Sequence, residues 1–207
     1  MPKTIIFDLD GTLVDVVPLF VEIFNTLADD FSYSKITPEE ITSIKEKNLG
    51  WFLFTKLGLR LWRYREFSEK GQALYLEHLE TIEWFPGMPE LFFRLKESGY
   101  TVGVLSSNSI EAIRKLLAQK NLQADFVATA SLSNKAAALK NTLLSQKIDP
   151  ESTFYVGDEL RDIRACQKAG IPIIAVTWGL NSKESLIRTG VPTVDSVAEL
   201  EQMLAQQ

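Results

Sequence analysis

The feature that most constrains the fold of this chain is an alternation of two sequence patterns after residue 87. Short runs rich in β-branched and aromatic residues favour strands, and they are separated by stretches with helical spacing of apolar residues. The runs cover residues 100–105, 126–130, 153–156 and 171–176. Such alternation predicts a parallel sheet with helices on both faces, because helices make the crossovers between parallel strands. The apolar run 4–7 is expected to be the first strand of the same sheet.

A long block without a strand pattern separates the first strand from the others. Apolar side chains recur every three or four positions from residue 17 to 31, which predicts a helix. Residues 37–40, Thr-Pro-Glu-Glu, have the form of a capping box with proline at the first helical position. We therefore predict that residues 15–83 form an all-helical insertion, and that residues 1–14 and 84–207 form one α/β domain.

The composition of the 207 residues is that of an ordinary globular protein. A net charge of −5 argues against a nucleic-acid surface, which usually needs a basic stripe. The longest apolar stretches are about ten residues, shorter than the roughly 20 that span a membrane. The single cysteine, Cys166, excludes an internal disulfide framework. The N-terminus does not have the pattern of a signal peptide, so we expect a cytoplasmic protein.

Polar and charged side chains follow four of the predicted strands. In a parallel sheet, ligands bind beyond the carboxyl ends of the strands, which meet at one edge. The residues are Asp8 and Asp10 after the first strand, Ser106, Ser107 and Asn108 after the second, Ser131, Ser133, Asn134 and Lys135 after the third, and Asp158 and Asp162 after the fourth. The sequence therefore predicts several carboxylates, one ammonium group and a cluster of hydroxyl and amide groups at that edge.

This set of groups is typical of a phosphoryl-transfer site. Mg²⁺ takes oxygen ligands, usually one or two carboxylates together with water and substrate phosphate. Hydroxyl groups, backbone N–H groups and a lysine suit phosphate oxygens. A remaining carboxylate can act as a nucleophile. Phosphate monoesters hydrolyse so slowly without a catalyst that one pair of aspartates would not be enough.

The motifs resemble, in order and position, those of the haloacid dehalogenase-like hydrolase superfamily over almost the whole chain. FDLDGT resembles the first motif, LSSNS the second, the lysine of SLSNKAAALK the third and VGDELRD the fourth. VTWGLNS adds a similarity to the phosphoglycolate phosphatase-like branch. The resemblance implies an α/β fold with a Rossmann-like parallel sheet core, helices on both faces and an inserted all-helical cap.

The resemblance also implies how the residues divide the chemistry. Asp8 would be the nucleophile that forms an aspartyl-phosphate, and Asp10 the general acid and then the general base. Lys135 would neutralise the nucleophile and the phosphate, although Lys140 in the same motif is an alternative. The residues implied to bind phosphate are Ser106, Ser107 and Asn108, together with Lys135.

A metal site is implied beside the nucleophile. Asp8, the backbone carbonyl of Asp10 and Asp158 would bind Mg²⁺, and Asp162 would lie behind them. Glu159 stands where the family often has a small residue, and we expect its side chain to point away into solvent.

The activity implied is Mg²⁺-dependent hydrolysis of a small phosphate monoester, of the phosphoglycolate type. Three alternatives stay open: a phosphomutase, a phosphonate hydrolase using Lys45, Lys47 or Lys56 of the cap, and a non-catalytic regulatory or binding module. A small phosphorylated metabolite is the expected partner, without nucleic acid or membrane, and a homodimer is left open.

The insertion also carries a run of aromatic residues. We expect them to form the core of the cap or an interface, and a role in lining the substrate gap stays open. They are Trp51, Phe52, Phe54, Trp62, Tyr64 and Phe67.

Overall fold

A six-stranded parallel sheet organises the computed structural model of the chain, which describes residues 3–37, 40, 54–55, 57–131 and 134–206. The strand order is β5-β4-β1-β6-β7-β8, and every neighbouring pair is parallel. The strands are β1 (Thr4–Phe7), β4 (Thr101–Ser106), β5 (Phe126–Thr129), β6 (Thr153–Gly157), β7 (Ile173–Val176) and β8 (Thr193–Val194). The predicted α/β class is therefore confirmed, and β1 lies in the middle of the sheet.

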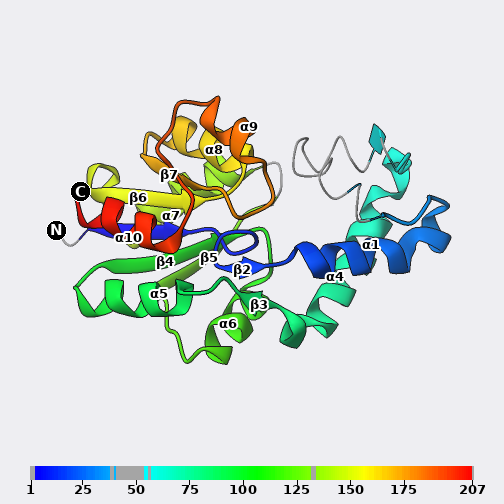
Figure 1. Cartoon of the computed structure of the whole chain (residues 1–207), viewed down its shortest axis with the longest axis horizontal. Coiled ribbons are helices and arrows are strands. Elements are labelled where there is room, and N and C mark those ends of the chain that lie inside the picture. The colour runs from blue at the N-terminus through cyan, green and yellow to red at the C-terminus, as the bar shows by residue number, and fades with distance from the viewer. Residues whose placement is uncertain (1–2, 38–39, 41–53, 56, 132–133, 207) are drawn as a thin grey trace.

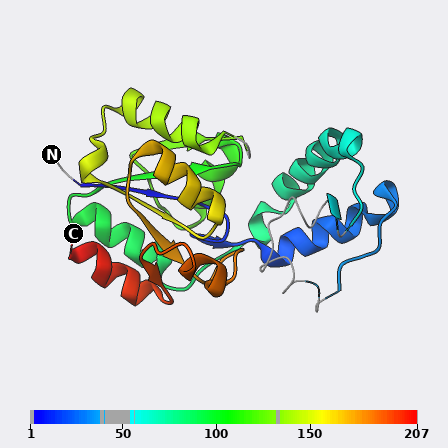
Figure 2. The same cartoon turned by 90° about the horizontal axis from the view of Figure 1, so that it is seen from above.

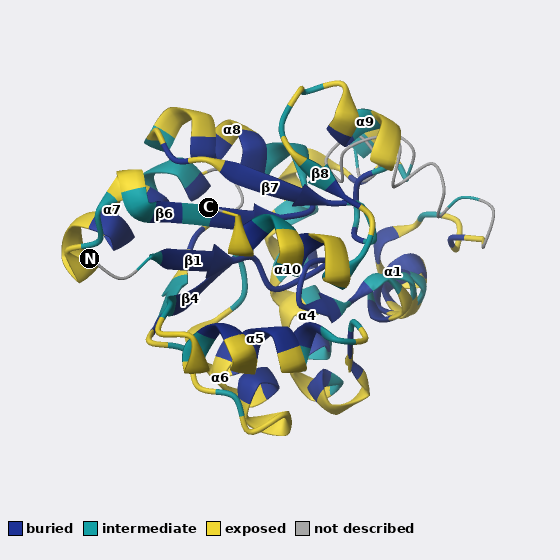
Figure 3. Cartoon of the chain, turned by 60° about the vertical axis from the view of Figure 1, so that its left-hand side comes forward, coloured by how far each residue is buried: buried dark blue, intermediate teal, exposed yellow. Residues whose placement is uncertain are grey.

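Helices cover both faces of this sheet, as the sequence pattern predicted. They are α5 (Met88–Glu97), α6 (Ile110–Gln119), α7 (Lys135–Gln146), α8 (Leu160–Ala169), α9 (Lys183–Ile187) and α10 (Val197–Ala205), with a 3₁₀ turn, η4 (Pro150–Ser152), before β6. Side chains alternate along β1: Ile5 and Phe7 pack in one buried cluster with α5, α6 and α10. Ile6 packs in a second cluster with α7, α8 and α9. Figure 3 shows β1 and β7 enclosed by these layers.

The insertion leaves and re-enters this domain at one place. β2 (Val14–Asp15) pairs antiparallel with β3 (Glu83–Trp84), so the outgoing and returning chains lie side by side. The N–H of Phe85 also donates to the carbonyl of Leu13 at 3.1 Å. The boundaries predicted for the insertion, 15–83, fall at this pair. Two-residue strands carry no readable periodicity, which is why β2, β3 and β8 were not predicted.

Two helices make up most of the described part of the insertion. They lie beyond the carboxyl ends of the strands (Figures 1 and 2). They are α1 (Val17–Phe31) and α4 (Tyr64–Glu77), with the 3₁₀ turns η2 (Leu61–Arg63) and η3 (Leu79–Thr81) at the ends of α4. The helix predicted over 17–31 is confirmed. Phe67 of α4 packs against Phe24 and Phe31 of α1, with ring centroids 5.6 and 5.2 Å apart, so this aromatic residue belongs to the core of the insertion.

Part of the insertion lies outside the described residues. This part includes Pro38 and Glu39 of the predicted capping box, the lysines Lys45, Lys47 and Lys56, and the aromatic residues Trp51 and Phe52. Of the capping box, the structure shows the N–H of Thr37 donating to Glu40 Oε2 at 3.1 Å. None of the helices in the described ranges is long and apolar enough to cross a membrane.

Candidate active site

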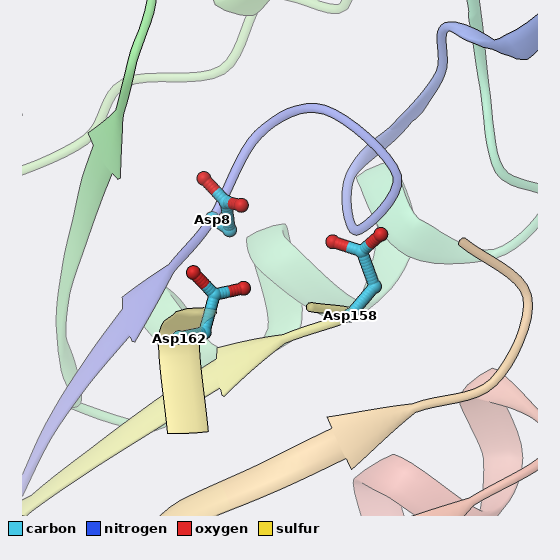
Figure 4. A group of neighbouring side chains, drawn as sticks. All are labelled: Asp8, Asp158 and Asp162. Carbon is cyan, nitrogen blue, oxygen red and sulfur yellow. The ribbon is translucent and has the colours of Figure 1, made fainter. Parts of the chain in front are cut away.

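Three buried carboxylates meet at the carboxyl edge of the sheet. Asp8 directly follows β1, and its N–H donates to Val156 O at 2.9 Å, which continues the β1–β6 ladder by one residue. Asp158 directly follows β6, and Asp162 lies in the first turn of α8. One oxygen from each of the three lies within 4.8 Å of the others, and Figure 4 shows the carboxylates turned toward a common space. All three side chains are buried.

Lys135, the first residue of α7, supplies the positive charge. Its Nζ lies 3.0 Å from Asp8 Oδ2 and 2.5 Å from Asp162 Oδ1, and the side chain is only 6% exposed. Lys140 lies on the same helix but is exposed. The geometry therefore favours Lys135 over Lys140 as the lysine of the site.

Asp158 is held between two glycines and two hydrogen-bond donors. Thr12 Oγ1 donates to Oδ1 at 3.0 Å, and the N–H of Leu180 donates to Oδ2 at 2.6 Å. A Cβ at either Gly11 or Gly179 would lie 2.2 Å from Oδ2, so only glycine leaves room for this carboxylate. Sequence reasoning did not assign these supporting residues, although they lie in the DLDGT and VTWGLNS motifs that carried the resemblance.

The electrostatics of the three carboxylates call for a cation. Burial raises the pKa of Asp8, and Lys135 only partly offsets this effect. Burial also raises the pKa of Asp158 well above its usual range, and the charges of Glu159 and Asp8 add to the shift. For Lys135, burial lowers the pKa, but Asp162 and Asp8 outweigh it and hold the pKa above its usual range. The positive charges of Lys135 and Arg161 therefore do not offset the effect of burial on the pKa of Asp8.

The residues present fit a hard divalent cation. The donor set is made of carboxylate oxygens, which Mg²⁺ and Ca²⁺ prefer. The oxygens lie close enough to share one ion, and ionised carboxylates this deeply buried need a counter-charge. Asp162 is already engaged, because it binds Lys135 and accepts a hydrogen bond from the N–H of Glu159 at 3.2 Å. The other two carboxylates are engaged as well, since Lys135 binds Asp8 and the donors of Thr12 and Leu180 bind Asp158.

Glu159 is not solvated, and this prediction was wrong. Its side chain is 13% exposed and pairs with Arg161, with Glu159 Oε1 2.6 Å from Arg161 Nη2. Glu159 is also the N-cap of α8 and forms a reciprocal capping box with Asp162. Burial raises the pKa of Glu159 to about 7, although Arg161 opposes the shift. The need to cap α8 explains why the residue turns inward.

Asp10 is separated from the cluster and held by hydrogen bonds of its own. Tyr75 Oη of α4 donates to Asp10 Oδ1 at 2.7 Å, and Asn108 Nδ2 donates to Asp10 Oδ2 at 2.6 Å. Burial raises the pKa of Asp10 to about 6, although the hydrogen bond from Tyr75 opposes the shift. A carboxyl group with this pKa can both give and take a proton near neutral pH. Sequence reasoning missed Tyr75, which carries no motif.

Comparison of the sequence with known protein families agrees with this set of site residues. A family profile described as haloacid dehalogenase-like hydrolase matches residues 5–176, which include every carboxylate described above. The chain belongs to the haloacid dehalogenase-like hydrolase family. It is therefore an enzyme of the hydrolase class, and the resemblance identified from its motifs is confirmed.

Relatives of this hydrolase carry phosphatase names. It is 32% identical to a phosphoglycolate phosphatase of Synechococcus elongatus over 188 residues, covering 89% of this chain and 88% of that protein. It is 24% identical to the pyrophosphatase PpaX of Bacillus mycoides, covering 89% and 87%. Its fold matches the crystal structure of a predicted phosphatase from Clostridium acetobutylicum with a TM-score of 0.84 and 21% identity, covering 100% of both chains.

The second motif of this hydrolase lies at the end of β4, beside Asp10. Ser106 is buried, and its Oγ accepts a hydrogen bond from the N–H of Asn108 at 3.1 Å. Ser107 and Asn108 line a pocket together with Asp10. Ser106, Ser107 and Asn108, which were predicted to bind phosphate together with Lys135, are therefore placed beside Asp10. Ser133 lies outside the described residues.

The same pocket extends between the sheet edge and the insertion. It has a volume of about 150 Å³ and is walled mainly by apolar and aromatic side chains of α1 and α4. The lining residues are Asp10, Phe20, Ile23, Phe24, Tyr64, Phe67, Ser68, Gly71, Gln72, Tyr75, Ser107 and Asn108. Tyr64 and Phe67, two of the aromatic residues singled out in the sequence, therefore line the gap between the two parts of the hydrolase.

Proposed function

We propose that this hydrolase is a Mg²⁺-dependent phosphatase that cleaves a small phosphate monoester through an aspartyl-phosphate intermediate. One observation carries the proposal: Asp8 is buried at the end of β1, 3.0 Å from Lys135 and close to Asp158 and Asp162. The relative named phosphoglycolate phosphatase supports a small anionic ester of the phosphoglycolate type as substrate.

In the first step, an oxygen of Asp8 attacks phosphorus and the bond from phosphorus to the ester oxygen breaks. The leaving alkoxide takes a proton from the Asp10 carboxyl group. Lys135 stays protonated beside Asp8 and attracts the phosphoryl oxygens. Ser106, Ser107 and Asn108 contribute hydrogen-bond donors to the same phosphoryl group.

In the second step, the Asp10 carboxylate takes a proton from a water molecule, whose oxygen attacks the phosphorus of the aspartyl-phosphate. The bond between Asp8 and phosphorus breaks, which regenerates the Asp8 carboxylate and releases inorganic phosphate. Asp10 thus returns to its protonated form for the next cycle.

Mg²⁺ would be held by Asp8, the backbone carbonyl of Asp10 and Asp158. When bound, it supplies positive charge that stabilises the charge developing on the phosphoryl oxygens. Thr12 and the N–H of Leu180 fix the orientation of Asp158, and Asp162 fixes Lys135.

We further propose that residues 15–83 act as a cap over the site, while residues 1–14 and 84–207 carry the catalytic groups. The support is the pocket that α1 and α4 share with the edge of the sheet. A cytoplasmic location belongs to the proposal, and fractionation of cells would check it. Light scattering of the purified protein would decide between a monomer and the homodimer that the sequence left open.

The decisive experiment is a screen of phosphate monoesters with Mg²⁺ and with excess EDTA. Wild type should release phosphate only with Mg²⁺, and Asp8→Asn should lose turnover by at least about 10⁴-fold, because an amide cannot serve as the nucleophile. Asp29→Asn, a change at an exposed aspartate of α1, is the matched control and should remain active. Full activity in excess chelator, or in Asp8→Asn, would contradict the proposal.

A further inference from the structure

Tyr75 connects the helical insertion to a carboxylate of the sheet edge. It lies near the end of α4, 65 residues from Asp10 in sequence, and its hydroxyl donates to Asp10 Oδ1 at 2.7 Å. The Tyr75 side chain is 5% exposed, so this hydrogen bond is shielded from water. Hydrogen bonds to charged groups are stronger than those between neutral groups, and burial strengthens them further.

Asn108 completes a closed set of three hydrogen bonds. Its Nδ2 donates to Asp10 Oδ2 at 2.6 Å and to Tyr75 Oη at 2.9 Å, which uses both of its hydrogens. Each oxygen of the Asp10 carboxylate therefore has one donor, one from the sheet edge and one from the insertion. The rotation of the carboxylate about its own axis is fixed only when both parts of the molecule are in place.

The three hydrogen-bonded side chains, Asp10, Tyr75 and Asn108, line the pocket between the sheet and the insertion. They form its polar end, and Phe20 and Phe24 belong to its apolar wall. A phosphate ester bound at Asp8 would place its alcohol portion in this pocket, with the ester oxygen beside Asp10. The carboxyl proton must point at that oxygen, and a misplacement of about 1 Å can cost about 10²-fold in rate.

We propose that Tyr75 is the positioning residue through which the insertion orients Asp10 for proton transfer. This proposal rests on the proposed phosphatase function, because it assigns Asp10 as the acid and base. Tyr75 keeps its own proton throughout: in each step the proton passes between Asp10 and the ester oxygen or water. The insertion thereby controls the chemical step itself, in addition to enclosing the substrate.

The test is Tyr75→Phe, which removes the hydroxyl and keeps the buried ring. With an alkyl phosphate and Mg²⁺, kcat should fall by about 10- to 100-fold, the effect of one hydrogen bond to a charged group. KM and the affinity for Mg²⁺ should change by less than about twofold, because Tyr75 acts through Asp10. The matched control is Tyr33→Phe, which removes another hydroxyl hydrogen bond of the insertion, to Phe24 O at 2.6 Å. Its kcat should stay within about twofold of wild type.

A double-mutant cycle separates positioning from a general structural effect. On p-nitrophenyl phosphate, adding Tyr75→Phe to Asp10→Asn should reduce turnover by less than about twofold, since the group that Tyr75 positions is already gone. An unchanged kcat in the single variant, a rise in KM alone, or a full additional loss in the double variant would each overturn the inference. If wild type hydrolyses no ester with Mg²⁺, the proposed function itself fails; if wild type is active and Tyr75→Phe matches it, only the positioning role fails.

Discussion

Replacing Gly11 with alanine should weaken Mg²⁺ binding by pushing Asp158 out of place. Gly11 has φ +79°, and a Cβ there would lie 2.2 Å from Asp158 Oδ2 and 2.7 Å from its Cγ. The carboxylate would have to retreat by about 1.2 Å to reach ordinary contact at about 3.4 Å. The room for this retreat is limited, because the backbone at Gly179 crowds the same oxygen: a Cβ added there would also lie 2.2 Å from it.

The substitution should lower both the stability of the fold and the affinity for Mg²⁺, and the two effects can be measured separately. A non-glycine residue at this positive φ costs about 1–2 kcal/mol of stability in any context. Moving Asp158 also strains its hydrogen bond from Leu180 N, now 2.6 Å. It would also misplace a carboxylate of the proposed Mg²⁺ site, and Mg²⁺ demands nearly ideal geometry. Changes to groups that orient a metal ligand usually lower affinity by about 10- to 100-fold, and we expect that loss here.

Gly190→Ala is the matched control. Gly190 has φ +77°, almost the same backbone conformation, but a Cβ there would have no neighbour within 4 Å. Both variants should therefore unfold at lower urea concentration, Gly11→Ala by more because Asp158 is also displaced, while calorimetric titration should show weaker Mg²⁺ binding only for Gly11→Ala. Wild-type affinity in Gly11→Ala, or an equal loss in Gly190→Ala, would refute the reasoning.

Two further predictions concern Asp10 and the pocket. Because burial raises the pKa of Asp10 to about 6, above its unfolded value, ionised Asp10 destabilises the metal-free fold above that pH. Lowering the pH from about 7 to about 5 should therefore stabilise wild type by about 1 kcal/mol relative to Asp10→Asn in urea unfolding, and parallel pH profiles would contradict this. Gly71→Leu should fill the pocket from α4, where a Cβ would meet Ile23 at an ordinary 3.8 Å. Its kcat/KM for phenyl phosphate should fall by about 10-fold while that for methyl phosphate is retained, and equal losses for both esters would show that the leaving group lies elsewhere.

The sheet and its polar edge could be predicted because both depend on local pattern. The apolar run before Asp8 and the β-branched run before Asp158 end where the polar residues begin, and parallel strands bring those ends together. Lys135 and Lys140 could not be separated from the sequence alone, because the choice depends on the residue at which α7 begins. The structure starts that helix at Lys135, directly beside Asp8.

The contributions of the insertion could not be predicted for a different reason. Tyr75 is one of several aromatic residues at helical spacing, and nothing in its neighbourhood distinguishes it from a core residue of α4. Its function comes from the approach of α4 to Asp10 and Asn108, a contact between segments distant in sequence. Glu159 was misjudged because its exposure depends on Arg161 and on the capping of α8.

Because β2 pairs with β3, the insertion begins and ends at neighbouring positions of the chain fold. Val14 lies opposite Trp84, so the two ends of a segment of about 70 residues are separated by one strand spacing, about 4.8 Å. A short turn could join these ends without moving β1 or α5, and a helical segment of another length could be spliced between them. Under the proposed cap role, this segment could be exchanged while the sheet keeps its aspartates, provided that the replacement offers Asp10 a hydrogen-bond donor in place of Tyr75.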